Sequence, residues 1–174
     1  ITIDFGVMGS ISGGAGDDTL TGNSGDNVIS GLGGNDTLSG GAGADNLKGG
    51  TGADTLTGGA GADTLTGGAG SDTASYSGSS AAVTVNLTTG LGSGGDAASD
   101  TLSGIENITG SDYADTLTGD NSANTLTGGT GADTLTGGAG SDTVTGGAGN
   151  DSITVSGKSG AYTDTIDGGT GTDS

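Results

Sequence analysis

Apolar residues recur along the chain once in every nine positions, and glycine, threonine and aspartate fill most of the positions between them. The repeated phrase is G-G-x-G-x-D-x-(Leu/Ile)-x. Seven copies follow one another from Gly13 to Ser75, and five more run from Gly110 to Thr154. The aliphatic residue at position eight lies between polar residues at positions seven and nine, which indicates a short strand with one buried face. The chain is therefore expected to consist largely of short strands of one kind.

Each position of the phrase has a physical role. Glycine at positions one, two and four permits positive φ angles and close backbone approach, which suits a tight turn. Aspartate at position six ends that turn, and positions six to nine, typically Asp-Thr-Leu-Thr, form the strand. One turn and one strand per phrase predict an all-β solenoid, in which two phrases make one coil and the coils stack into two parallel sheets. The predicted core consists of the position-eight residues Leu20, Ile29, Leu38, Leu47, Leu56, Leu65, Ala74, Leu117, Leu126, Leu135, Val144 and Ile153.

Residues 76–109 separate the two blocks and lose most of the phrase. Apolar and polar residues alternate over 83–87, which predicts a longer strand, and the glycine-rich residues 90–100 predict a loop. Residues 101–109 return toward the register, with Glu106 in the place of the aspartate. The pattern is compatible both with a wider coil that continues the solenoid and with a break between two rolls. We divide the chain into a first block at 1–75, an inter-block segment at 76–109 and a second block at 110–174.

Charge and composition limit the classes of binding partner and of fold that the chain can have. The chain has 21 acidic residues against two lysines, and its formal net charge of −19 disfavours nucleic acid and direct membrane insertion. All acidic residues but Glu106 are aspartate, whose short carboxylate suits turns and the ligation of hard cations. Glycine accounts for 44 of 174 residues without a period of three and without proline, which excludes collagen. The absence of cysteine excludes disulfides and thiolate metal sites.

Catalysis is not expected of this chain. It contains no histidine or cysteine, so a serine or threonine nucleophile would lack its usual base, and we expect no catalytic residues. The aromatic residues Phe5, Tyr76, Tyr113 and Tyr162 are expected at roll edges, at caps or in packing. Because the chain starts at Ile1 and stops within a phrase, we expect it to be a segment of a longer protein.

The acidic side chains should prevent the solenoid from folding without a cation. Stacked coils place aspartate above aspartate, and one small aliphatic side chain per phrase offsets little of the conformational entropy of a glycine-rich backbone. We therefore expect the metal-free chain to be mostly disordered, and a divalent cation to neutralise the carboxylates and link turns two phrases apart. The expected ladders are Asp18, Asp36, Asp54 and Asp72; Asn27, Asp45 and Asp63; Asp115, Asp133 and Asp151; and Glu106, Asn124, Asp142 and Asp164.

The donor set predicts the metal. All candidate ligands are oxygens, which favours Ca²⁺ over Zn²⁺ or Cu²⁺, and irregular carbonyl-rich loops favour Ca²⁺ over Mg²⁺. About eight or nine Ca²⁺ ions would offset most of the formal charge of −19.

The phrase resembles the RTX (repeats-in-toxin) nonapeptide, a Ca²⁺-binding β-roll signature. The resemblance implies a right-handed parallel β-roll, with each Ca²⁺ between turns on position-six aspartates and on backbone carbonyls of the glycine-rich turn. The matching aspartates are Asp18, Asp36, Asp45, Asp54, Asp63, Asp72, Asp115, Asp133, Asp142 and Asp151. The matching carbonyls belong to Gly14, Gly16, Gly41, Gly43, Gly50, Gly52, Gly59, Gly61, Gly68, Gly70, Gly129, Gly131, Gly138, Gly140, Gly147 and Gly149. Weaker ligands are expected at Asn27, Glu106, Asn124, Asp164 and Asp173.

The resemblance also implies export through a type I channel and folding outside the cell, where Ca²⁺ is abundant. Two roles follow. The first is a structural segment of a secreted bacterial surface protein, such as an S-layer lattice protein, because the whole chain is rich in Thr, Ala, Gly and Ser and nearly free of lysine. The alternative is the export and folding module of a type I-secreted enzyme, toxin or adhesin.

Overall fold

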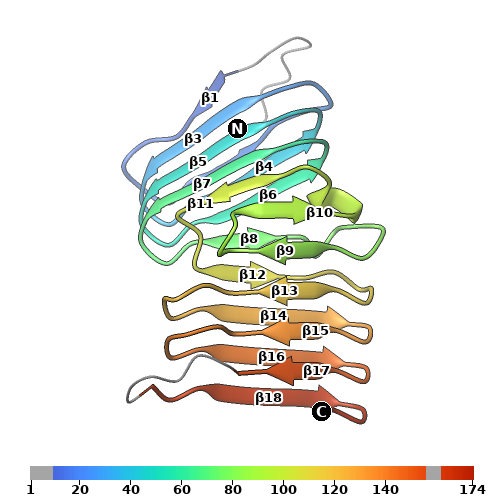
Figure 1. The fold of residues 1–174 in the computed structure, drawn as a ribbon. Helices are drawn as coiled ribbons and strands as arrows, with labels where there is room; N and C mark the ends of the chain where they lie inside the picture. The colour runs from blue at the N-terminus through green and yellow to red at the C-terminus, as the bar shows by residue number, and fades with distance from the viewer. Residues whose placement is uncertain (1–9, 156–161) are drawn as a thin grey trace.

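The computed structural model describes residues 10–155 and 162–174, so Phe5 lies outside the described residues. The described chain is all-β apart from one 3₁₀ turn, η1 (Gly95–Ala97), and its strands form two sheets (Figure 1). The ten-stranded sheet contains, in spatial order, β1 (Ser10–Ser12), β3 (Val28–Gly33), β5 (Asn46–Thr51), β7 (Thr64–Ala69), β11 (Thr101–Ser103), β10 (Leu91–Ser93), β9 (Thr84–Asn86), β13 (Thr116–Thr118), β15 (Thr134–Thr136) and β17 (Ser152–Thr154). The eight-stranded sheet contains β18 (Thr165–Thr170), β16 (Thr143–Ala148), β14 (Thr125–Thr130), β12 (Asn107–Thr109), β8 (Thr73–Ser75), β6 (Thr55–Ala60), β4 (Thr37–Ala42) and β2 (Thr19–Thr21).

Strand pairing follows the nine-residue register. Within each block, successive strands alternate between the two sheets, and each strand pairs in parallel with the strand two phrases away, as Leu38 does with Leu56. The prediction of a parallel solenoid with two phrases per coil is confirmed. The strands begin at position seven, and β3 to β7 run on through position three of the next phrase, further than predicted. They are longer because residues at positions two and three of the next phrase also pair between coils, as Gly41 does with Gly59.

The core consists of aliphatic side chains that both sheets contribute to the space between them. The position-eight residues from Leu20 to Ala74 and from Leu117 to Val144 are buried, as predicted. Ile153 is only partly buried, and Ile166 is 48% exposed because β17 and β18 are the last strands of their sheets. Tyr76 also packs in the core, whereas Tyr113 and Tyr162 lie at the surface.

The inter-block segment forms a three-stranded meander. β10 pairs antiparallel with both β9 and β11, β11 pairs in parallel with β7, and β9 pairs in parallel with β13. The expectation of one longer strand followed by a loop was wrong: the chain turns back after Asn86, and part of the expected loop forms β10 and η1. The turn at Gly90, which has a φ of 67°, closes on the carbonyl of Asn86 and ends β9 early.

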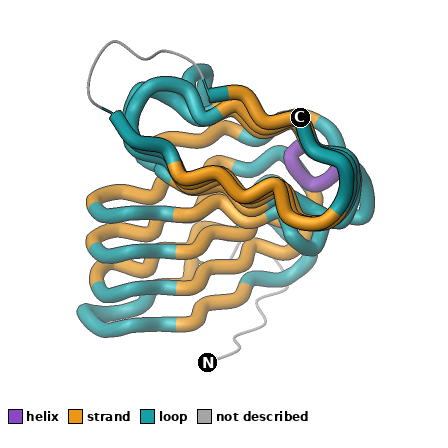
Figure 2. The backbone as a smooth tube through the Cα atoms, turned by 90° about the horizontal axis from the view of Figure 1, so that it is seen from below, coloured by secondary structure: helices purple, strands orange, loops and turns teal. Residues whose placement is uncertain are grey.

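The meander bends the stack of coils. In the eight-stranded sheet, β12 pairs directly with β8 and β14, so this sheet has no additional strand at the inter-block segment. The other sheet gains β9 and β10 at the same level and is therefore two strands wider. The coils before and after the meander are consequently inclined to each other, as Figure 2 shows.

Leu32 occupies position two of its phrase, where most copies have glycine, and it adopts a φ of 83° with its side chain 53% exposed. A left-handed conformation costs a residue with a Cβ about 1–2 kcal/mol. Leu32→Gly is therefore expected to raise the free energy of unfolding of the Ca²⁺-loaded chain by about 1 kcal/mol, measured by urea denaturation. Leu91→Gly is the matched control, because Leu91 is equally exposed but has no positive φ. That control should lower stability, and a loss of stability in both variants would contradict the assignment of strain to Leu32.

Candidate metal centre

The position-six side chains form ladders along both edges of the roll. In nearly every step, the backbone N–H of one rung donates to a carboxylate oxygen of the next; Asp36 donates to Asp54 at 2.7 Å, and Asp54 donates to Asp72 at 2.8 Å. Between Glu106 and Asn124, the side-chain amide of Asn124 donates instead to the backbone carbonyl of Glu106. One ladder follows the eight-stranded sheet through Asp18, Asp36, Asp54, Asp72, Glu106, Asn124, Asp142 and Asp164. The other contains Asn27, Asp45, Asp63 and, directly before β11 of the meander, Asp100; after the meander it contains Asp115, Asp133, Asp151 and Asp173.

Asp100 belongs to this ladder, although its rung was not predicted. Its Oδ1 accepts the N–H of Asp63 at 2.8 Å across 37 residues, and the side chain is fully buried. The signal was present in the sequence, because Asp100 to Gly104 reads D-T-L-S-G, the second half of the phrase. The glycine-rich half before it is absent, and the prediction therefore assigned Asp100 to a loop.

The second carboxylate oxygen of many rungs is buried without a donor. Such an oxygen costs free energy, because burial removes water from the carboxylate and the protein supplies no hydrogen bond in return. The atoms concerned are the Oδ2 atoms of Asp36, Asp45, Asp54, Asp63, Asp72, Asp133 and Asp151.

Backbone carbonyl oxygens surround these carboxylates. A Cβ added to Gly49, at position one, would collide with Oδ2 of Asp54 and lie 2.7 Å from the carbonyl oxygen of Gly67 in the next coil. Carboxylate and carbonyl oxygens thus converge on one small space beside this glycine, an arrangement that suits a cation. The predicted carbonyl ligands lie in the same turns, and all of them except Gly14 and Gly16 have a positive φ.

Carboxylates alone do not complete a metal shell. Among the described residues, no group of three or more acidic side chains converges as a metal site. An ion between two coils would therefore take few carboxylate oxygens and most of its ligands from the backbone. Ca²⁺ accepts such a shell, because it tolerates six to eight oxygens in irregular geometry.

Burial raises the pKa of the ladder carboxyls. The pKa of Asp63 and of Asp133 rises to about 6, chiefly through desolvation and further through neighbouring carboxylates. Desolvation also raises the pKa of Asp36, Asp45 and Asp72. In the metal-free roll, ionising these groups is unfavourable, which is the same deficit that a bound cation would relieve.

These pKa shifts predict that the pH dependence of stability reverses when Ca²⁺ is bound. A folded pKa of about 6, above the ordinary value of 3.8, adds stability at low pH that is lost as the pH rises through about 6. In Ca²⁺-free buffer, lowering the pH from 7.5 to 5 should therefore increase the β-sheet signal in circular dichroism. With Ca²⁺, the same change should decrease stability, because protons compete for the ligands. Loss of β-sheet on acidification in both buffers would contradict the assignment.

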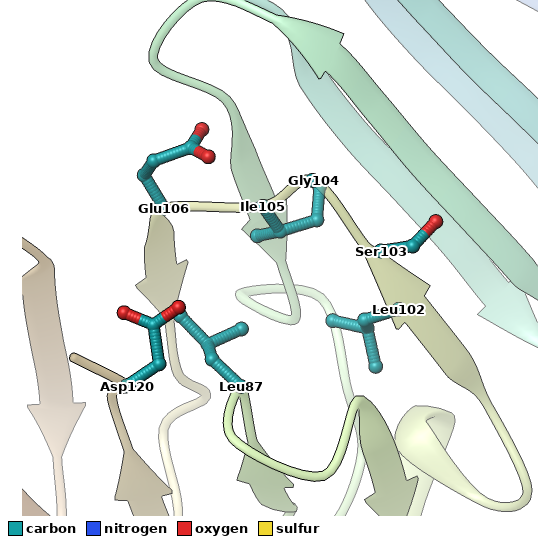
Figure 3. Close-up of a pocket in the computed structure, with 7 residues that line it drawn as sticks. All are labelled: Leu87, Leu102, Ser103, Gly104, Ile105, Glu106 and Asp120. Carbon is teal, nitrogen blue, oxygen red and sulfur yellow. The ribbon is translucent and has the colours of Figure 1, made fainter. Parts of the chain in front are cut away.

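A small pocket lies where the meander interrupts the regular stacking. Its volume is about 90 Å³, too small for a typical organic ligand, and its lining is apolar at Leu87, Leu102 and Ile105. The carboxylates of Glu106 and Asp120 lie at one side of it (Figure 3). Each already accepts a hydrogen bond from a backbone N–H, of Asp72 and Ser122 respectively.

Parallel coils with buried carboxylate ladders beside glycine-rich turns define a metal-binding β-roll. The chain belongs to the RTX calcium-binding nonapeptide repeat family, whose model matches residues 12–47, 39–74, 100–135, 118–153 and 158–174. Binding of Ca²⁺ is therefore the function of the roll, and it is a structural rather than a catalytic module. A search of curated proteins gave no match. RTX repeats typically occur in secreted proteins, and no helix in the described part of the chain could span a membrane.

Proposed function

We propose that Ca²⁺ ions bind between successive turns along both ladders and drive the folding of the roll. The row of seven buried carboxylate oxygens without donors carries this proposal. The ligands are the position-six aspartates and the carbonyls of the positive-φ glycines, with Asn27, Glu106, Asn124, Asp164 and Asp173 as weaker contributors. Asp18 and Asp115 contribute less than the central rungs, because backbone N–H groups already satisfy their Oδ2 atoms.

One ion between each turn of this geometry and the turn of the next coil would give about eight or nine ions. Nine described turns have a positive φ at position two, at Leu32, Gly41, Gly50, Gly59, Gly68, Gly129, Gly138, Gly147 and Gly169. Native mass spectrometry of the chain in Ca²⁺ tests the count. A plateau near eight or nine ions is expected, whereas saturation at two or three would contradict the ligand set.

We infer that the roll is a structural segment of a secreted, self-assembling bacterial surface protein of the S-layer kind. The support is the composition, which remains rich in small residues and nearly free of lysine even in the inter-block segment. Electron microscopy of the secreted protein that carries this chain, after Ca²⁺ titration, tests the role. An ordered array that dissolves in chelator is expected. Dispersed particles at every Ca²⁺ concentration would instead favour the export and folding module of a type I-secreted enzyme, toxin or adhesin.

A further inference from the structure

The turns of the roll are of two kinds, which differ at position two. In four turns, the residue at position two has no positive φ, and its backbone N–H donates to the position-six side chain. These bonds run from Gly14 to Asp18 at 2.7 Å, from Asn23 to Asn27 at 2.7 Å, from Ser111 to Asp115 at 2.5 Å and from Asp120 to Asn124 at 2.8 Å. All seven carboxylate oxygens without donors lie in turns of the other kind, where position two has a positive φ. We call the first kind protein-closed turns.

The Asp100 rung has a protein donor in the place of an ion. The hydroxyl of Tyr76 donates to Oδ2 of Asp100 at 3.1 Å, and both side chains are buried. Oδ1 of Asp100 accepts the N–H of Asp63, so each oxygen of this carboxylate has a partner. No other tyrosine of the described chain lies in the core.

The next rungs along the chain are satisfied in the same way. The hydroxyl of Ser111 donates to Asp115, adding to the backbone N–H of the same residue. Oδ1 of Asn124 accepts the backbone N–H of Asp120, and its side-chain amide donates to the carbonyl of Glu106 at 2.9 Å. Asp100, Asp115 and Asn124 therefore have protein partners beyond the ladder bonds. On both sides, the Oδ2 atoms from Asp36 to Asp72 and of Asp133 and Asp151 have none.

The same part of the chain holds the most local pairing of the fold. β9 and β10 form an antiparallel hairpin whose turn is closed by Gly90 and Thr89 on Asn86, and β11 follows after η1. Parallel pairs, including that of β9 with β13, join residues 18 or more positions apart, which makes loop closure more costly than in the hairpin. Val85 of β9 and the preceding Val83 are buried in the core, as is Tyr76.

We propose that residues 76–127 fold without Ca²⁺ and act as a template from which the ion-dependent coils form in both directions. The segment offers an edge to each side, β11 for β7 and β13 for β15. The protein-closed turns at 13–30 do not form such a template, because they lie at one end of the roll against ion-dependent coils and lack the meander. The contrast between the segment and its flanks rests on the ion sites proposed above.

Hydrogen exchange of the whole chain tests the template, with mass spectrometry in Ca²⁺ and in EDTA. In EDTA, amides whose acceptors also lie within 76–127, such as those of Leu87, Leu102 and Thr116, are expected to exchange at least tenfold more slowly than those of β4 to β6 and β16. Uniform, unprotected exchange in EDTA with full protection in Ca²⁺ would overturn the template and leave the proposed calcium function standing. Protection that is the same in EDTA and in Ca²⁺ would instead overturn the ion sites.

Tyr76→Phe tests the hydroxyl, because it removes one oxygen and keeps the packing. In EDTA, exchange within 76–127 should accelerate by about tenfold to 100-fold, because the buried Asp100 carboxylate loses its donor. Tyr113→Phe, at an exposed tyrosine of the same segment, is the matched control and should leave exchange unchanged. Adding Asp100→Asn to Tyr76→Phe removes the unpaired charge and should restore protection. Unchanged exchange in Tyr76→Phe, or failure of the double variant to recover, would overturn the role of this pair.

Discussion

Removal of Ca²⁺ by a chelator is expected to convert most of the far-ultraviolet circular dichroism of this chain from β-sheet to coil, reversibly. At neutral pH, the folded chain buries carboxylate oxygens that have no donor, as at Asp54 and Asp133, and stacks their charges in ladders. One aliphatic side chain per nine residues does not offset this deficit together with the entropy of a glycine-rich backbone. Residues 76–127 should supply the β-sheet signal that remains in chelator.

Two controls separate ligation from screening. NaCl at the same ionic strength should restore little of the β-sheet signal, because buried charges are weakly screened by salt. Mg²⁺ at the same concentration should also restore little, because it demands near-octahedral geometry and dehydrates reluctantly. A chain with its full β-sheet signal in chelator would contradict the energetic argument. Full recovery in NaCl would show that screening is sufficient without a bound ion.

The regular part of the fold could be predicted because every phrase buries the same position and pairs in the same register. Alternation around residues such as Leu38 and Leu56 determines which side chain is buried, and the nine-residue period determines the register. A shift of one residue in register would expose the aliphatic side chain in every coil, so alternative registers are strongly disfavoured. The ladders follow from the same register, since residues 18 positions apart must lie one above the other.

The inter-block segment could not be predicted in the same way, because it occurs once. The fold of the meander depends on β11 pairing back to β7 and on the bond from Tyr76 to Asp100, and both contacts join residues that the local pattern does not connect. The sequence did not distinguish the two kinds of turn either. Glycine at position two occurs in both, at Gly14 and at Gly50, and only the backbone conformation shows whether the N–H reaches the carboxylate.

Asp54→Asn is expected to weaken two ion sites at once. Asp54 lies between Asp36 and Asp72 in one ladder, so its carboxylate borders the gaps on both sides. The amide keeps the oxygen that accepts the N–H of Asp36 but removes the charge, which leaves the ladder bond in place and weakens ligation. A site occupied at 100 times its dissociation constant contributes about 2.7 kcal/mol, so weakening two sites should cost on the order of 5 kcal/mol in saturating Ca²⁺.

Asp26→Asn is the matched control for this prediction. Asp26 is an exposed acid at position five of the same block, and its Oδ1 likewise accepts a backbone N–H, from Ala44 at 2.8 Å. The control therefore removes one negative charge near the roll without touching a buried rung, and it should change stability by less than about 0.5 kcal/mol. Calorimetric titration and urea denaturation in Ca²⁺ measure both variants. If Asp54→Asn loses one ion and Asp26→Asn loses none, each aspartate serves a single site and the shared ladder is wrong. If the two variants behave alike, the buried rungs bind Ca²⁺ no more tightly than the surface, and the calcium sites lie elsewhere in the turns.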